Sequence, residues 1–188
     1  MPSRSPQPPA SVDPGAPRVH HAGVPLRPPC QRPRLIDSSA FHPKTRQLYD
    51  YWRSIHPAAG LPGRQHFDPE QIPRLLPGLR LLEVQDTPFR LRYRLIGSKI
   101  DRVIGHSFTG RWFDEVHAGD PNFPALLEDY RITVVEHRPT WRRGPPRVHH
   151  DRNCAEIEGI RLPLASDGQR VDMVIALALY FDLRGEEI

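Results

Sequence analysis

The segment that most restricts the possible fold is VDMVIALALYF, residues 171–181, close to the end of the 188-residue chain. Successive side chains of a strand point to opposite faces of a sheet. Both sets are apolar here: Val171, Met173, Ile175, Leu177 and Leu179 on one face, and Val174, Ala176, Ala178 and Tyr180 on the other. A strand that is apolar on both faces is typical of a central strand covered on both sides. We therefore expect a layered fold in which this strand lies inside the sheet.

The second cover is expected from a helix near residue 50. Phe41, Leu48, Trp52 and Ile55 recur at helical spacing with polar residues between them, which predicts an amphipathic helix of about four turns. Either this helix or a partner's copy of it is expected to cover the second sheet face. The same four residues are thus the candidate docking helix of a homodimer that forms through this helix and the outer sheet face.

Proline divides the chain into segments. Most of the excess among its 23 prolines falls before residue 44, and the first 36 residues carry the whole net charge of +4. Such a segment has little to bury and is expected to be disordered. We predict a tail at residues 1–40, one formally neutral domain at 41–182 and a short C-terminal tail at 183–188. A neutral domain argues against nucleic acid as a partner, and no apolar stretch predicts a membrane span or secretion signal, so a cytoplasmic location is expected.

The other expected elements complete an α+β pattern. Strands are predicted at residues 79–84, 89–95 and 155–164, with a weak edge strand after Pro139. A short helix follows Asp68, and a longer helix covers residues 122–136. In the 89–95 strand, apolar and basic residues alternate. Its core-facing residues are predicted to be Phe89, Leu91, Tyr93 and Leu95.

This order, and several motifs, resemble the PAS domain superfamily. Residues 97–120, GSKIDRVIGHSFTGRWFDEVHAGD, are similar to the PAS segment before its long helix. The YW pair at 51–52, LPGR at 61–64, DPEQIPRLLP at 68–77 and LPLASDG at 162–168 resemble a bacterial subfamily of short, often single-domain PAS proteins. The resemblance implies a five-stranded antiparallel sheet with a helical segment over one face, and a role in sensing, dimerisation or signalling rather than catalysis. It identifies no ligand.

Residues that could carry chemistry form no convincing set. His149, His150, Asp151 and Cys154 have metal-ligating types, but adjacent strand residues point apart, so no metal site is predicted. His106, His117 and His137 leave a haem ligand possible only in principle, and no cysteine between residues 97 and 136 supports a flavin adduct. No nucleophile elbow, P-loop or HExxH motif occurs. We predict no enzyme activity, and the cofactor is unknown.

Two functions stay open from the sequence. The domain could be a sensor whose cavity lies between the sheet and the long helix. The candidate cavity residues are Phe108, Phe123, Leu127, Tyr130, Ile157 and Met173. Alternatively, it could be a dimerisation or adaptor module with a filled core and no ligand, whose 41–55 helix and outer sheet face bind another copy or a signalling protein.

Overall fold

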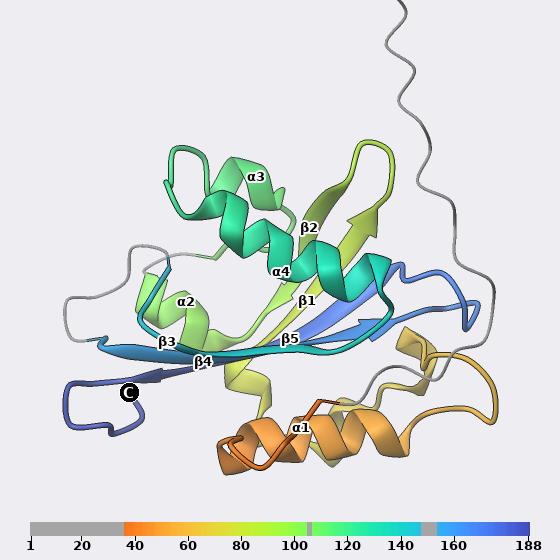
Figure 1. Cartoon of the computed structure of the whole chain (residues 1–188), viewed down its shortest axis with the longest axis horizontal. Helices are drawn as coiled ribbons and strands as arrows, with labels where there is room; N and C mark the ends of the chain where they lie inside the picture. Colours follow the sequence, from red (N-terminus) through yellow and green to blue (C-terminus); the bar gives the residue numbers. More distant parts are fainter. Residues whose placement is uncertain (1–35, 105–106, 148–153) are drawn as a thin grey trace, which may run out of the picture.

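A computed structural model describes residues 36–104, 107–147 and 154–188. It shows one five-stranded antiparallel sheet with helices on both faces (Figure 1). The helices are α1 (Pro43–Ser54), α2 (Ser98–Ile104), α3 (Phe113–Val116) and α4 (Phe123–Val135). The strands are β1 (Leu79–Gln85), β2 (Arg90–Ile96), β3 (Thr140–Gly144), β4 (Glu156–Leu164) and β5 (Met173–Phe181). The predicted disordered tail lies, up to residue 35, outside the described residues.

The strand order confirms the prediction drawn from the apolar C-terminal segment. The order is β2-β1-β5-β4-β3, so β5 is the central strand. Every residue of β5 after Met173 is buried. β3, which was predicted as a weak edge strand, lies at one edge. These features, together with the helices between β2 and β3, are those expected of a PAS-like fold.

Helix α1 of the same chain covers one face of the sheet (Figure 1). Leu48 and Trp52 are 0% exposed, and the indole Nε1 of Trp52 donates a hydrogen bond to the carbonyl oxygen of Pro163, 2.9 Å away. Pro43 occupies the first turn, where its missing N–H costs nothing, and the Nδ1 of His42 accepts a hydrogen bond from the Lys44 N–H. The apolar stripe of α1 is thus buried within its own chain.

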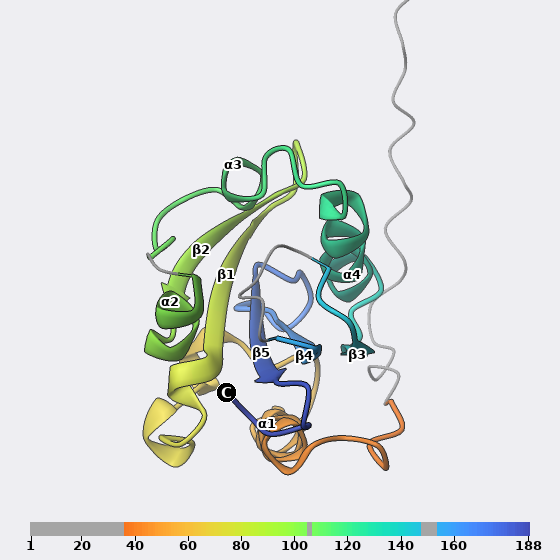
Figure 2. The same cartoon turned by 90° about the vertical axis from the view of Figure 1, so that its left-hand side faces the viewer.

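The remaining helices lie on the opposite face of the sheet. Figure 2 shows α2 and α3 beside β2, and α4 on the other side, above β3 and β4. The long helix was predicted at residues 122–136 and is found at Phe123–Val135. The sheet therefore has α1 below it and three helices above it, which gives each face of β5 its own apolar cover.

The prediction that Leu95 of β2 faces the core is wrong. Leu95 is 49% exposed, whereas Ile96 is buried. The register between β1 and β2 shifts between Leu81 and Leu82, so that Arg94 has no direct partner on β1. An extra residue of this kind reverses the side-chain alternation beyond it, which turns Leu95 outward and Ile96 inward.

The helix predicted after Asp68 is also shorter than expected. Only a single 3₁₀ turn forms there, Pro69–Gln71, with Asp68 accepting a hydrogen bond from the Glu70 N–H. Pro73 has no N–H to continue the helical ladder. Two further turns, Arg64–His66 and Leu76–Gly78, complete the segment that leads into β1.

The chain end folds back onto the domain. The Ile188 N–H donates to the carbonyl oxygen of Tyr180. The carboxylate of Glu187 accepts hydrogen bonds from Lys44 on α1 and Lys99 on α2, at 2.7–2.8 Å. This carboxylate therefore connects helices from opposite faces of the sheet.

Candidate functional site

A cavity of about 60 Å³ lies between the sheet and its helical cover. This volume would hold roughly four water molecules. The cavity is lined by residues from the sheet, from α2 and α4, and from the connecting segments: Arg80, Tyr93, Ile96, Ile100, Phe108, His117, Leu126, Arg142, Arg147, Ile157, Gly159, Arg161 and Tyr180. Four of them are arginines, an unusual residue type for the interior of a domain.

The pairing of the strands explains why arginines meet there. Ala176 of β5 pairs with Arg80 of β1 on one side and with Arg161 of β4 on the other. Directly paired residues share a sheet face, so the two arginines flank an alanine. The next row holds Ala178, Gly159 and Arg142. The small residues Ala176, Ala178 and Gly159 leave space above the sheet, and the arginines surround this space.

Several guanidinium atoms in this cavity are buried without a hydrogen-bond partner. Arg161 is 8% exposed, and neither its Nε nor its Nη1 has a partner within the described residues. The Nε of Arg80 is also buried and has no partner, although the Arg80 residue as a whole is only half-buried. An unsatisfied buried donor costs about 1–3 kcal/mol, and more when it is charged. These N–H groups are available to an acceptor.

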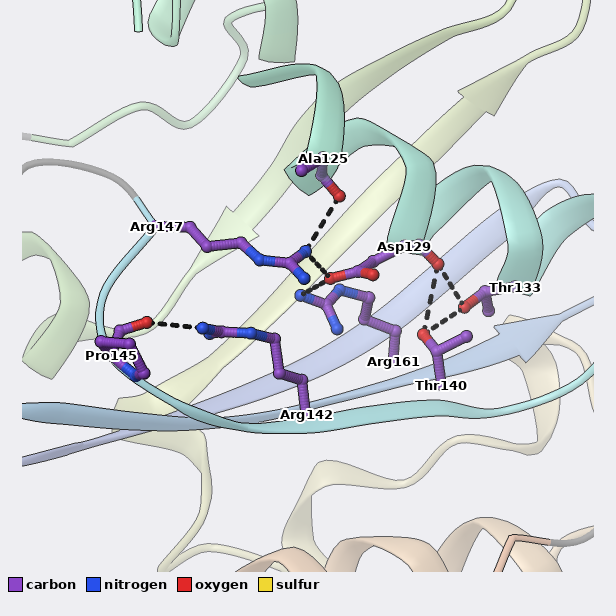
Figure 3. Close-up of polar contacts among 8 residues, drawn as sticks. All are labelled: Ala125, Asp129, Thr133, Thr140, Arg142, Pro145, Arg147 and Arg161. Atoms are coloured by element: carbon purple, nitrogen blue, oxygen red, sulfur yellow. Dashed lines mark hydrogen bonds and ion pairs between the residues drawn. The ribbon is translucent and has the colours of Figure 1, made fainter. Parts of the chain in front are cut away.

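Asp129 of α4 is the acid that contacts this cluster (Figure 3). Its Oδ2 lies 2.8 Å from Nη1 of Arg147 and 3.2 Å from Nη2 of Arg161. Its carbonyl oxygen accepts hydrogen bonds from the hydroxyls of Thr133 and Thr140. Asp129 thereby joins α4 to β3, to β4 and to the segment after β3.

Arg147 and Arg142 also bind backbone carbonyls, as Figure 3 shows. Nη1 of Arg147 donates to the Ala125 oxygen at 3.0 Å, and Nη2 of Arg142 donates to the Pro145 oxygen at 2.7 Å. These bonds fix the side chains but neutralise no charge.

Positive charge in this cluster is only partly compensated. Four guanidinium groups face the single carboxylate of Asp129 within the described residues. Burial, together with the neighbouring charges of Arg147 and Arg161, lowers the pKa of Arg142. Burial is also the main cause that lowers the pKa of Arg161. Guanidinium groups stay protonated in proteins regardless, so the cavity remains cationic.

Tyr93 and Tyr180, which line the cavity, stay neutral. Burial raises the pKa of Tyr93 and of Tyr180 above the usual value. The hydroxyl of Tyr93 lies 3.0 Å from Nε2 of His117. The Arg161 guanidinium lies over the Tyr130 ring, 5.1 Å from its centroid, a favourable contact for a cation. The neutral hydroxyls of Tyr93 and Tyr180 therefore add no negative charge to the cavity.

Only some of the residues that the sequence predicted to line a cavity lie at this one. Phe108 and Ile157 line this one. Tyr130 lies beside it, below Arg161, whereas Phe123 and Leu127 are partly buried in the core. By strand alternation from Tyr180, Met173 lies on the α1 side of β5. Their predicted role in ligand binding stays a prediction.

Sequence reasoning did not find Arg80, Arg142, Arg147 and Arg161. A signal for Arg161 was available, because it interrupts the otherwise apolar run from Ile160 to Leu164 in a predicted strand. Arginine is almost never fully buried without a partner. An arginine within a core strand therefore merits attention as a site residue.

Metal and haem find no support in the site. Among the described residues, no group of three metal-ligating side chains lies together; His106, His149, His150 and Asp151 lie outside the described part. His117 lines the cavity, and His137 is exposed just after α4. Pockets for ordinary cofactors measure about 300–1,000 Å³, so the cavity of about 60 Å³ does not fit a porphyrin.

The chain was compared with known proteins and families. The family model of the PAS domain matches residues 40–176, well over half of the chain. No curated protein and no solved structure matches it. In the described residues, no helix is both long and apolar enough to cross a bilayer. The family match runs from α1 to the first residues of β5 and includes all four arginines of the cavity, and the chain therefore belongs to the PAS domain family.

Proposed function

We propose that this PAS domain is a non-catalytic, cytoplasmic sensory module that binds a small molecule in the arginine-lined cavity. The observation that carries the proposal is the buried guanidinium of Arg161, which has two nitrogen atoms without a partner in the described structure. Groups of this kind occur where strain or function requires them. A ligand that accepts their hydrogen bonds would remove the penalty of leaving them unpaired.

Asp129 gives a route from the cavity to the protein surface. It binds Arg161 and Arg147 through its carboxylate while its own helix, α4, lies at the surface of the domain. An anionic ligand on Nε and Nη1 of Arg161 competes with Asp129, which contacts Nη2, for the charge of the same guanidinium group. Occupancy of the cavity would then change how firmly α4 is held on β3 and β4, and a partner that contacts α4 could detect this difference.

An interaction module is the second candidate function. Leu95, an apolar side chain that is 49% exposed on the edge strand β2, favours it. The homodimer predicted through α1 and the outer sheet face remains a prediction. Since α1 already lies on that face in its own chain, two copies would have to meet through the outward side of α1.

Filling the cavity separates the two functions. A Cβ added at Gly159 would have the Leu177 carbonyl oxygen, 3.8 Å away, as its neighbour within 4 Å, so Gly159→Val places a β-branched side chain into free space. We expect wild type to gain thermal stability from members of a panel of short carboxylic acids, their amides and amino acids. Gly159→Val should lose every such shift while its own melting temperature stays equal or rises. A wild-type protein that no panel compound stabilises would contradict the sensor.

A further inference from the structure

We propose that the ligand is a small organic carboxylate, whose carboxylate group lies between Arg80 and Arg161 and whose short apolar chain contacts Ile96, Ile100 and Phe108. This proposal rests on the sensory function above and adds the chemical class of the ligand. It is carried by the charge, the spacing and the lining of the cavity, each of which restricts a different property of the ligand.

Charge requires an anion. Within the described residues, Asp129 contacts Arg147 and Arg161, but no carboxylate forms an ion pair with Arg80. Removing an ion from water costs several kcal/mol unless a counter-charge and hydrogen bonds replace its solvent. A cationic ligand would add to this cost, and a neutral acceptor would satisfy hydrogen bonds but supply no counter-charge. An anion lowers it.

Spacing places the anion between two guanidinium groups. Arg80 and Arg161 are both paired with Ala176 across β5, so their Cα atoms are about 10 Å apart, twice the spacing of adjacent strands. Two long side chains that start this far apart on one face can approach an acceptor from both sides. The methyl group of Ala176 is small enough to leave room between them.

Hydrogen-bonding geometry favours an oxyanion. A guanidinium group presents parallel N–H donors that match the two oxygens of a carboxylate or of a phosphate. The unpartnered atoms are Nε of Arg80 and Nε and Nη1 of Arg161. Three donors suit one carboxylate, whose two oxygens offer about four acceptor sites. The neutral hydroxyl of Tyr93 also lines the cavity, 3.0 Å from Nε2 of His117.

The rest of the lining favours a carboxylate with a short carbon chain over inorganic phosphate. Ile96, Ile100 and Phe108 line the same cavity, and Ile100 is 0% exposed. These side chains offer nothing to the additional oxygens of phosphate, which would lose their water without replacement. A cavity of about 60 Å³ accommodates only a few heavy atoms beyond the carboxylate. A chain of three to five carbons meets both limits.

Calorimetric titration of the full chain tests the ligand class with four probes of matched size. Butyrate is expected to bind. Butyramide, which has the same shape without the charge, and n-butylamine, which has the opposite charge, should each bind at least about 30-fold more weakly, as is typical when a buried charge loses its partner. Inorganic phosphate supplies the oxyanion without the apolar chain and should also bind more weakly than butyrate.

Two variants assign the binding to the cavity. Arg80→Gln and Arg161→Gln should each weaken butyrate binding about 30-fold or more. Arg170→Gln is the matched control, because it removes the same charge from a side chain that is 66% exposed and pairs with Asp86. It should leave the butyrate affinity unchanged. Circular dichroism spectra and melting temperatures of the variants establish that each of them is folded.

The outcomes separate this proposal from the function on which it rests. If butyramide binds as tightly as butyrate, or if the arginine variants bind butyrate like wild type, the cavity does not recognise its ligand by charge. The proposal of a carboxylate ligand is then wrong. If phosphate binds more tightly than butyrate, the cavity binds an oxyanion, but the proposal of an organic carboxylate is wrong. If none of the probes binds and Gly159→Val alters nothing in the wider panel, the sensory function fails as well.

Discussion

Arg80 and Arg161 lie in one row of the sheet, each paired with Ala176 from opposite sides of β5. Two arginines so placed inside a domain repel one another: the charge of Arg80 is one of the causes that lower the pKa of Arg161. The strand pairing therefore produces a cationic cavity where the composition of the domain, with equal numbers of acidic and basic residues beyond residue 36, predicts no excess charge.

The free energy of unfolding should depend strongly on the sign of a charge introduced at position 176. Ala176→Asp places a carboxylate between the two guanidinium groups, and we expect its free energy of unfolding to stay within about 1 kcal/mol of wild type. Ala176→Lys, of larger size and opposite charge, should cost at least about 3 kcal/mol. Ala176→Met controls for size alone. Urea unfolding of the three variants measures the difference, and equal losses for Asp and Lys would argue against uncompensated charge.

Asp129→Asn should both destabilise the domain and strengthen its response to anions. The variant loses the ion pairs with Arg147 and Arg161, at a cost of about 2–3 kcal/mol for a partly buried pair. Its carbonyl bonds to Thr133 and Thr140 are retained. Thermal unfolding with and without butyrate checks both effects. The increase in melting temperature caused by butyrate should be larger than in wild type, and a smaller increase would contradict competition for Arg161.

Trp52→Ala tests the docking of α1. The side chain is 0% exposed, and its indole N–H binds the Pro163 carbonyl. We expect a loss of about 3–5 kcal/mol in the free energy of unfolding. Trp52→Phe, which keeps an aromatic ring but loses the hydrogen bond, should cost less. Chemical denaturation gives both values, and an unchanged midpoint for Trp52→Ala would show that α1 adds little to stability.

Glu187 makes the stability depend on pH. Burial raises the pKa of its carboxyl group, but hydrogen bonds from Lys44 and Lys99 outweigh this and hold the pKa below the ordinary 4.5. A carboxyl whose pKa is lower in the folded state stabilises the fold above its unfolded pKa, and this contribution is lost as pH falls through the folded value. Glu187→Gln should therefore cost about 1 kcal/mol at neutral pH.

Unfolding of wild type and Glu187→Gln at pH 7 and pH 3 measures this contribution. The difference between the two proteins should shrink at the lower pH, where the wild-type carboxylate takes up its proton. Glu186→Gln, at the preceding residue, whose side chain is exposed, is the control and should behave like wild type at both pH values. A difference that grows toward low pH would contradict the pairing.

The sequence by itself determined the elements and their layers. The apolar faces of β5 predicted a central, doubly covered strand, and the spacing of Leu48 and Trp52 predicted the helix that covers one side, because each pattern is a local property of the chain. The arginine cavity was decided only by the tertiary structure. Arg80 and Arg161 are 81 positions apart, and their common row depends on the register of β1 and β4 against β5. The outward turn of Leu95 depends in the same way on a register shift. Register follows from long-range pairing between strands, and local alternation carries no information about which rows will meet.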